Sequence, residues 1–487
     1  MNLLTLLIFI PIFSAAIIAV SSTNLKWTKI IASLASLAIV LITIKLFMDF
    51  NVQGSIQFEV NIPWIASYGI AYHLGLDGFS LTIMMLVAIL LPLTFTFMLD
   101  RSTKGMFIAM LLAQGGATGA LFSLDMILFY LFWETMLLPI FIMIGLYGIK
   151  NRQKVALRLT LYTIFGSLAM LFAILVLAYH YFNLNGVWSF NLHTLAQFHT
   201  QVELPIWIYI AFLSAFLIKI PMFGFHGWLK SAYESAPTPT LIILSGIMAK
   251  LGIYTIYRFI FLLFPQEVID SSIYLIGLGI LGMLYFGIAA LMQKELRILF
   301  AYSSASHMSL IVIGLFTLNI YGVSGGLYLI TAHALATGGL FLILAIIAEQ
   351  SQTTVMEDHS GIIHQSPWLG VLFTLFALSI VGIPGSSGFV AELLIIIGSF
   401  QYNLAVGFLT TTTVLIAMTF TLWLLQRMVF GPISTTTQKM ISISTKDGIS
   451  LSIIAFIIYF MGIMPDIFIT YFDPTLNTSL SNFGARP

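Results

Sequence analysis

Long apolar runs separated by short polar breaks follow one another along almost the whole chain. Each run holds about 20 residues, the length that an α-helix needs to cross the hydrocarbon core of a bilayer. The repeated short segments of alternating polarity that a transmembrane β-barrel requires are absent. The pattern therefore predicts an all-α integral membrane protein of about fourteen transmembrane helices. We place these helices near 2–20, 27–48, 79–99, 106–122, 125–148, 158–182, 205–228, 238–263, 271–291, 298–318, 322–349, 368–400, 404–430 and 449–472.

The charge content agrees with a membrane protein. Only 8% of the 487 residues are charged and 60% are apolar, with a mean hydropathy of +1.04, whereas a soluble domain averages roughly 25% charged residues. The net charge is +1 and no basic cluster stands out, so the sequence gives no sign of nucleic-acid binding.

Residues that hold cofactors are scarce. The chain has no cysteine, which excludes disulfides and cysteine-ligated iron–sulfur clusters within it. Its nine histidines are scattered rather than set at the spacing of metal ligands. One G-x-G-x-x-G match, at Gly277, Gly279 and Gly282, lies inside an apolar run with no strand before it, so we attribute it to helix packing. We expect no cofactor and no metal in this chain, and any redox chemistry would belong to another chain.

Lysine and arginine are unevenly distributed between the two sides of the predicted membrane. With the N-terminus outside, 14 of the 19 lysines and arginines fall in loops or helix ends on the inner side, as the positive-inside rule requires. No basic region precedes the first apolar segment, so we expect this segment to remain as a helix and not to be a signal peptide. Both termini and the long loops 49–78 and 183–204 then lie on the outer side.

Four charged residues lie near the centres of predicted spans: Glu134, Lys219, Lys250 and Glu392. Each opposes insertion by about 2.5–3.5 kcal/mol, so each must pair with another group or face a polar interior. A static buried ion pair is one explanation, but ionisable residues inside membranes usually mark ion pathways.

Two histidines lie at similar depth, His307 and His333. A lone membrane histidine is often only a hydrogen-bonding group between helices. Here both lie between helices that carry lysine and glutamate, and imidazole titrates near neutral pH, so we interpret them as proton-relay groups.

Proline and glycine interrupt two of the predicted spans. Pro221 follows Lys219 closely, and the segment Gly382–Gly388 shortly precedes Glu392. A broken helix in each half of the chain, with an ionisable residue nearby, indicates a transporter built from two inverted repeats. We therefore divide the chain into helices 1–3 with an external loop (1–105), a first five-helix repeat (106–263), a second five-helix repeat (271–430), and an inner loop with a last helix (431–487).

Short motifs occur in a fixed order across about 260 residues. They are Phe129–Glu134, Lys219–Pro221, His226–Leu229, Ala236–Thr238, Ala249–Gly252, Ala301–Ser304, Ser306–Met308, His333–Leu335, Gly382–Gly385 and Phe389–Glu392. In these motifs the chain resembles the antiporter-like membrane subunits of respiratory complex I, and among them the M type, called chain 4 in mitochondria. The chain departs from the usual pattern at 230–233, where the family commonly has proline, an acid, alanine and histidine, and in the inner loop 350–367.

The resemblance implies a role for each matching ionisable residue. Glu134 and Lys219 would form a coupled ion pair, and Lys250 would be the central relay. His307 and His333 would continue a hydrated axis to Glu392, the terminal proton carrier. The acid at this last position, in place of the lysine common in the sister subunits, favours the M type.

The resemblance also implies a function and partners. The expected function is proton translocation within a proton-pumping NADH:quinone oxidoreductase, in contact with neighbouring antiporter-like subunits and lipids, while redox chemistry takes place in other subunits. Two alternatives stay open: a subunit of a multi-chain cation/proton antiporter, or of a related photosynthetic or other-donor complex. The expected location is the bacterial inner membrane, with the mitochondrial inner membrane or the thylakoid membrane as alternatives.

Overall fold

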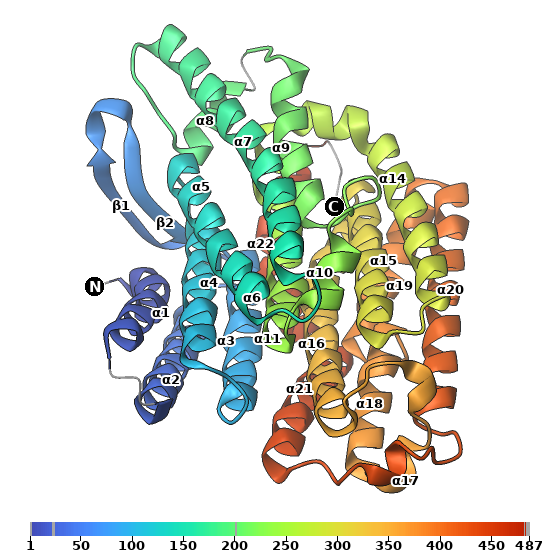
Figure 1. Ribbon diagram of the computed structural model, residues 1–487. Coiled ribbons are helices and arrows are strands. Elements are labelled where there is room, and N and C mark those ends of the chain that lie inside the picture. Colours follow the sequence, from blue (N-terminus) through green and yellow to red (C-terminus); the bar gives the residue numbers. More distant parts are fainter. Residues whose placement is uncertain (1, 22–24, 200–201, 482, 484–487) are drawn as a thin grey trace.

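The computed structural model describes residues 2–21, 25–199, 202–481 and 483, and most of them form helices packed side by side (Figure 1). The first half contains α1 (Leu3–Val20), α2 (Leu25–Asp49), β1 (Gln57–Ile65), η1 (Ala66–Tyr68), β2 (Ile70–Leu76), α3 (Gly78–Met98), α4 (Lys104–Phe122), α5 (Met126–Thr135), α6 (Leu137–Tyr147), α7 (Arg152–Asn185), α8 (Leu192–His199), α9 (Ile206–Lys219), α10 (Leu229–Ser235), α11 (Thr238–Ile243), η2 (Leu244–Met248), α12 (Ala249–Thr255), η3 (Ile256–Ile260) and α13 (Phe261–Leu263). The second half contains α14 (Pro265–Leu291), α15 (Leu296–Phe316), α16 (Ile320–Ser351), η4 (Met356–Asp358), α17 (Ile362–Gln365), α18 (Pro367–Ile380), α19 (Ser387–Tyr402), α20 (Leu404–Met428), η5 (Thr437–Lys439), α21 (Thr445–Ile463) and α22 (Asp466–Ser481).

Twelve helical segments within the described residues are long and apolar enough to cross a membrane. Two further predicted spans, 205–228 and 368–400, are each broken into shorter helices. Twelve continuous spans and two broken spans together match the expected number of about fourteen, so the prediction of a multi-pass helical membrane protein is confirmed.

The first break separates α9 from α10. We expected one helix through residue 228, but α9 ends at Lys219 and the chain turns until Leu229. Pro221 explains the difference, because proline lacks the N–H that the next helical turn needs and its ring clashes with the preceding turn.

The second break separates α18 from α19. Gly382 and Gly385 adopt φ values of +69° and +95°, which side chains with a Cβ rarely adopt. Helix α19 then begins after Ser386, whose side chain accepts a hydrogen bond from the Phe389 N–H as a helix cap. The glycines therefore end one helix and the serine starts the next, within the interruption that the sequence predicted at 382–388.

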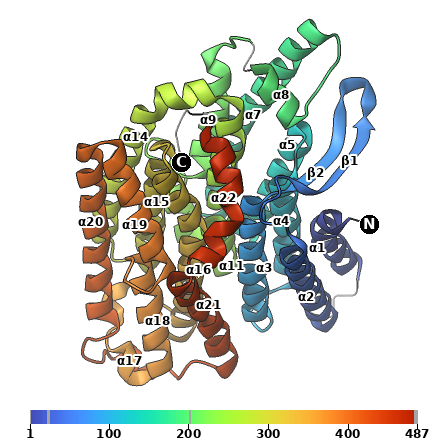
Figure 2. The same cartoon turned by 180° about the vertical axis from the view of Figure 1, so that it is seen from behind.

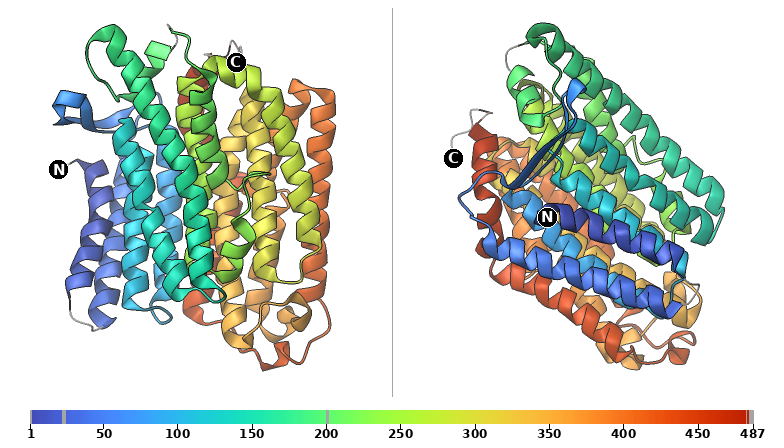
Figure 3. Two further views of the ribbon diagram at one scale, coloured as in Figure 1. Left: turned by 45° about the horizontal axis from the view of Figure 1, so that its top comes forward. Right: turned by 90° about the vertical axis from the view of Figure 1, so that its left-hand side faces the viewer.

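The loop 49–78, which we expected on the outer side, contains a two-stranded antiparallel hairpin, β1 and β2, with Asn61 opposite His73. The hairpin projects from the bundle beside the N-terminal helices (Figures 1 and 3). Ile62 and Trp64 at its surface are each 56% exposed. Exposed apolar side chains of this kind suit contact with lipid or with a partner protein.

The C-terminal segment differs from the prediction of one helix over 449–472. Two helices are present, α21 and α22, and they are separated at Met464–Pro465. Proline cannot continue a helix and restricts the residue before it, which explains the break. Helix α22 then packs against α3 and α16 (Figure 2).

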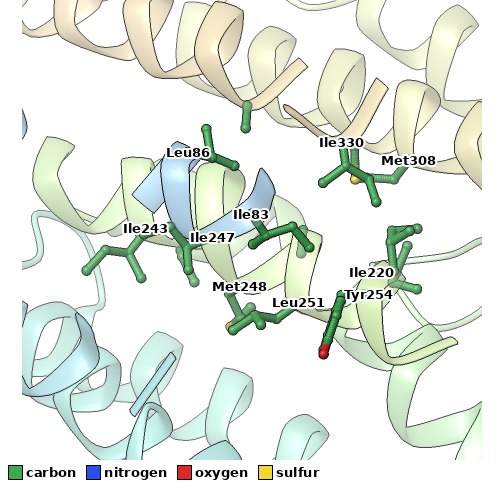
Figure 4. Packing of buried hydrophobic residues seen from close by; sticks show 14 of the residues in the cluster. Ile83, Leu86, Ile220, Ile243, Ile247, Met248, Leu251, Tyr254, Met308 and Ile330 are labelled. Carbon is green, nitrogen blue, oxygen red and sulfur yellow. The ribbon is translucent and has the colours of Figure 1, made fainter. Parts of the chain in front are cut away.

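The centre of the bundle is formed by three spans. Every position in the apolar window of 238–263 is buried, and 94% of positions are buried in the windows of α15 and α16. By contrast, only 33% and 35% are buried in α2 and α20, which lie at the periphery. Figure 4 shows the apolar packing around the central span, where Met248 and Leu251 lie among side chains from neighbouring helices.

Two glycines of the G-x-G-x-x-G match let α14 and α15 approach closely. A methyl group at Gly279 would lie 2.6 Å from the Ile313 side chain, and one at Gly282 would lie 2.5 Å from Ser309 Oγ. The motif therefore acts in helix packing, as expected.

Charged residues at one end of the bundle tie distant helices together. Asp100, just after α3, pairs with Lys29 at 3.4 Å and with Lys446 at 2.9 Å, and Arg101 pairs with Asp447 at 2.9 Å. The hydrogen bond from Lys446, with a smaller contribution from Lys29, lowers the pKa of the exposed Asp100 carboxyl. Lysines and an arginine that we assigned to the inner side thus lie together at one end of the protein.

Candidate functional site

Lys250 lies at the centre of the bundle, in α12, between the π-helical segments η2 and η3. Single π-helical turns within α-helices are frequently found at functional sites. The Lys250 side chain is completely buried, and its Nζ atom is 2.9 Å from Nδ1 of His333 on α16. An ammonium group can only donate, so a charged Lys250 makes His333 Nδ1 the acceptor and places the proton of a neutral ring on Nε2.

A second close pair continues from His333. The ring of His307 on α15 has its centroid 5.0 Å from that of His333, and its Nε2 atom is 3.4 Å from Oε1 of Glu392 on α19. All four residues are at most 4% exposed. The structure therefore brings Lys250, His333, His307 and Glu392 into one buried row that crosses from α12 to α19.

Polar atoms near this row lack partners among the described protein atoms. These atoms are His333 Nε2, Ser379 Oγ and Ser387 Oγ. A cavity of about 10 Å³ also borders His307 and Glu392, roughly the volume that accommodates one water. Buried polar atoms of this kind are usually satisfied by ordered water, so the surroundings suit proton movement.

Lys219 lies at the end of α9, apart from this row. Its Nζ atom is 3.2 Å from the centroid of the Trp133 ring and 3.5 Å from the Trp133 carbonyl oxygen. In the described part of the chain, no carboxylate oxygen lies within 4.0 Å of this ammonium group, although Glu134 acts on it electrostatically. The structure thus brings Lys219 to Trp133, and it places the partly exposed Glu134 near the lysine without a direct ion pair.

At each helix break, a backbone carbonyl without a helical hydrogen-bond donor contacts a side chain from another part of the chain. At the first break, the Trp228 indole donates to the Ile218 carbonyl at 2.9 Å. At the second break, His307 Nε2 lies 2.9 Å from the Ile380 carbonyl. The motifs contained Trp228 and His307, but nothing in their spacing indicated these two contacts.

A protein-family model covers more than half of the chain. It is described as the transmembrane region of the NADH:quinone oxidoreductase/Mrp antiporter family, and it matches residues 123–421. All six candidate residues lie within this range. The chain belongs to this family.

Individual members of the family align along nearly the full chain. Subunit M of NADH-quinone oxidoreductase from Rhodobacter capsulatus is 30% identical, with 99% of this chain and 97% of that protein covered. NADH-ubiquinone oxidoreductase chain 4 from Marchantia polymorpha is 31% identical, with coverage of 98% and 96%. A chain in the structure of respiratory complex I from Thermus thermophilus superposes with a TM-score of 0.90 at 25% identity, covering 99% of this chain and all of that chain. The resemblance to M-type subunits of complex I is confirmed.

This member of the NADH:quinone oxidoreductase/Mrp antiporter family has a further buried ion pair that the sequence analysis missed. Arg258 Nη1 donates to Asp77 Oδ2 at 2.6 Å, and both side chains are at most 8% exposed. The sequence contained one indication of this residue: Arg258 follows Lys250 by about two helical turns, which places both on a similar side of the predicted span. His193 lies beside this pair, and burial together with the nearby Arg258 charge lowers the pKa of His193 to about 4.

No metal site accompanies these residues in the part of the chain that the structure describes. Within it, no three histidine, aspartate or glutamate side chains are arranged to hold a metal ion.

Proposed function

We propose that this chain is a proton-translocating membrane-arm subunit of an NADH:quinone oxidoreductase, and that the redox reactions take place in other subunits. The buried row Lys250–His333–His307–Glu392 is the observation that carries the proposal. Ionisable residues at membrane depth are costly and typically form proton relays. The similarity to subunit M and chain 4 of such enzymes supports the same function.

A proton passes along the row by two kinds of step. Between Lys250 and His333 it moves within a hydrogen bond of 2.9 Å. Between His333 and His307, whose ring centroids are 5.0 Å apart, a ring rotation or one bridging water completes the path. Glu392 then exchanges the proton with His307, from which it is separated by 3.4 Å.

Lys219, which lies in the first predicted repeat and apart from the buried row, contributes to proton movement through its charge. The Trp133 ring and the Glu134 carboxylate both favour the ammonium form over the neutral amine. A movement of α5 relative to α9 would remove this stabilisation and release a proton. We propose this electrostatic coupling in place of a direct contact between Glu134 and Lys219.

The organisation of the chain follows from the same proposal. We assign 106–263 and 271–430 to two inverted repeats, flanked by 1–105 and 431–487. The positive-inside bias supports outer termini in a bacterial inner membrane. Labelling of single cysteines tests this topology, since the chain has none. A cysteine in place of Val187, which is 58% exposed in the loop 183–204, should react only from the outer side, and reaction from the inner side would overturn the topology.

A cation/proton antiporter without a redox partner is the second candidate, because the family description covers both kinds of complex. Purification in mild detergent separates the two functions. Flavin and iron–sulfur subunits should co-purify with an NADH:quinone oxidoreductase subunit, whereas an antiporter would bring only membrane chains.

Replacement of Lys250 tests the proposed function. We expect Lys250→Met to reduce NADH-driven proton uptake into sealed vesicles by about tenfold or more, since a tenfold change needs only about 1.4 kcal/mol. Lys230→Met is the matched control, because this lysine is exposed. An assembled Lys250→Met complex that pumps like the control would refute the function.

A further inference from the structure

The last turn of α18 has four carbonyl groups, at residues 377–380, whose partners lie beyond the helix end. Three of them accept hydrogen bonds from backbone N–H groups beyond the helix end: Ala377 from Val381, Leu378 from Ile383 and Ser379 from Gly382. The fourth carbonyl, that of Ile380, receives the ring nitrogen of His307, a residue of another helix. His307 therefore completes the hydrogen bonding of the broken helix.

Both ring nitrogens of His307 face carbonyl oxygens. Nδ1 is 2.8 Å from the carbonyl of Ser303, and Nε2 is 2.9 Å from that of Ile380. Carbonyl oxygens only accept hydrogen bonds, and a neutral imidazole has only one N–H. Both contacts can therefore be hydrogen bonds only when the ring carries a proton on each nitrogen.

A counter-charge for this imidazolium is present. Glu392 Oε1 lies 3.4 Å from the same Nε2, and the two side chains are 4% and 6% exposed. A buried cation is tolerated when it is paired and hydrogen-bonded. Glu392 belongs to α19 and Ile380 to α18, so one ring contacts both halves of the broken helix.

The other groups facing His307 fit this charge state. His333 approaches from α16, and a charged Lys250 would keep it neutral, because its Nδ1 must then accept the hydrogen bond from the ammonium group. The residues of α14 and α20 that border His307 and Glu392, namely Met283, Val414 and Ala417, carry no charge. The His307 imidazolium and the Glu392 carboxylate thus form an ion pair with no net charge. Among the residues named here, the one other charged group is Lys250, on the far side of His333.

We propose that the resting protein holds a proton on His307 as an imidazolium, and that this proton fastens α18 to α19 across the break. When the proton leaves, one ring nitrogen loses its hydrogen and must abandon either Ser303 or Ile380. Loss of the Ile380 contact frees a buried carbonyl at the break, which disfavours the closed arrangement of the two half-helices. Proton release and movement of the broken helix are thereby linked at one residue. The inference rests on the proposed function, since it names the group that holds the transported proton.

Solid-state nitrogen NMR of the assembled complex, with ¹⁵N-labelled histidine, tests this protonation state. Protonated and unprotonated ring nitrogens give separate signals, and subtraction of the His307→Gln spectrum from that of the wild type isolates His307. We expect the difference at pH 8 to contain two protonated nitrogens. An unprotonated nitrogen in the difference would overturn the proposal.

His180→Gln provides the matched control. His180 also places Nδ1 2.9 Å from a carbonyl one turn earlier, that of Val176, but no second carbonyl contact is found for its ring among the described residues. Its difference spectrum should contain one protonated and one unprotonated nitrogen.

Glu392→Gln keeps the test decisive if His307→Gln does not assemble. Without its counter-charge the ring should lose a proton, so the spectrum should gain one unprotonated nitrogen relative to the wild type. Identical histidine spectra in the two proteins would contradict the proposal. Pumping of the same samples is a separate readout. Normal pumping by Glu392→Gln would remove Glu392 from the proposed proton path. A neutral His307 in a pumping wild type would refute only the proposal that a proton on His307 holds α18 and α19 together.

Discussion

At the first helix break the Ile218 carbonyl accepts a hydrogen bond from the Trp228 indole, whereas at the second the Ile380 carbonyl faces the His307 ring. The indole N–H does not titrate at physiological pH, but imidazole does. The nearby charges differ in the same way: Lys219 lies against the ring of Trp133, while Glu392 lies against His307 itself. At the first break, the hydrogen bond to the freed carbonyl comes from a group that does not titrate, and the titratable Lys219 lies nearby without taking part in it. At the second break, the group that contacts the freed carbonyl can itself gain or lose a proton.

Replacing one glycine at each break by alanine should give the largest difference in proton uptake between the two breaks. A methyl group at Gly382 would lie 2.5 Å from Glu392 Oε2, whereas one at Gly224 meets nothing within 4 Å. Both glycines have positive φ, at +69° and +87°, so alanine costs about 1–2 kcal/mol at either position. We expect Gly382→Ala to abolish most proton uptake and Gly224→Ala to lower only thermal stability. Equal pumping by the two variants would show that the position of Glu392 does not matter.

Replacement of Glu134 should have the next largest effect. Glu134→Gln removes the negative charge that favours the Lys219 ammonium, so pumping and turnover should fall several-fold. Glu134→Asp keeps the charge and should preserve part of both activities. The measurement is proton uptake and NADH oxidation, each normalised to assembled complex. Wild-type pumping by an assembled Glu134→Ala protein would remove Glu134 from the mechanism.

Trp228→Phe tests the fixed character of the first break. It keeps the aromatic ring but leaves the buried Ile218 carbonyl without its donor, which should destabilise the protein by about 1–3 kcal/mol. Because the indole does not titrate, the pH profile of pumping should keep its shape. Thermal unfolding and pumping at several pH values provide the two readouts. A shifted pH profile would mean that the first break also contains a proton-dependent contact.

The smallest expected effect lies outside both breaks, at His193. The pKa of His193 is lowered to about 4 from 6.5 by burial and by Arg258, so the unfolded chain binds the proton more readily than the native one between these values. The stability contributed by a neutral His193 is therefore complete above pH 6.5 and is lost as pH falls toward 4. The protection of the α8 amides, that is, the ratio of intrinsic to observed exchange rate, should fall over this range, and His193→Gln should remove this fall without a change in pumping. Unchanged protection of these amides in the wild type would contradict the prediction.

The sequence predicted the features of the two breaks that depend on residues close together in the chain. Apolar runs gave most of the spans, and proline and glycine marked both breaks. Lys250 and Glu392 stood out because charges are rare at membrane depth. Pro465 carried the same kind of signal as Pro221, yet the break between α21 and α22 was not predicted.

Contacts between helices were beyond sequence reasoning. Which side chain meets Lys219 depends on how α5 and α9 are rotated about their axes, and this rotation places Trp133 against the ammonium group instead of Glu134. His307 and Glu392 are 85 positions apart in the chain (392 − 307), so their contact arises only when α15, α18 and α19 pack together. The segment that forms the hairpin of β1 and β2 was expected only as part of a long loop, because the register of a hairpin depends on pairing between strands.

Proton uptake by sealed vesicles containing the Glu392→Gln complex is the most direct test of the central claim, that the buried row carries protons. Glutamine keeps the size of the side chain but cannot titrate, so we expect most pumping to stop while the complex still assembles. Glu392→Lys restores a titratable group and should retain a measurable fraction, and Glu203→Gln, at an exposed acid, should pump normally. If the assembled Glu392→Gln complex pumps as fast as Glu203→Gln, Glu392 is a structural hydrogen-bonding group and the proton leaves by another route.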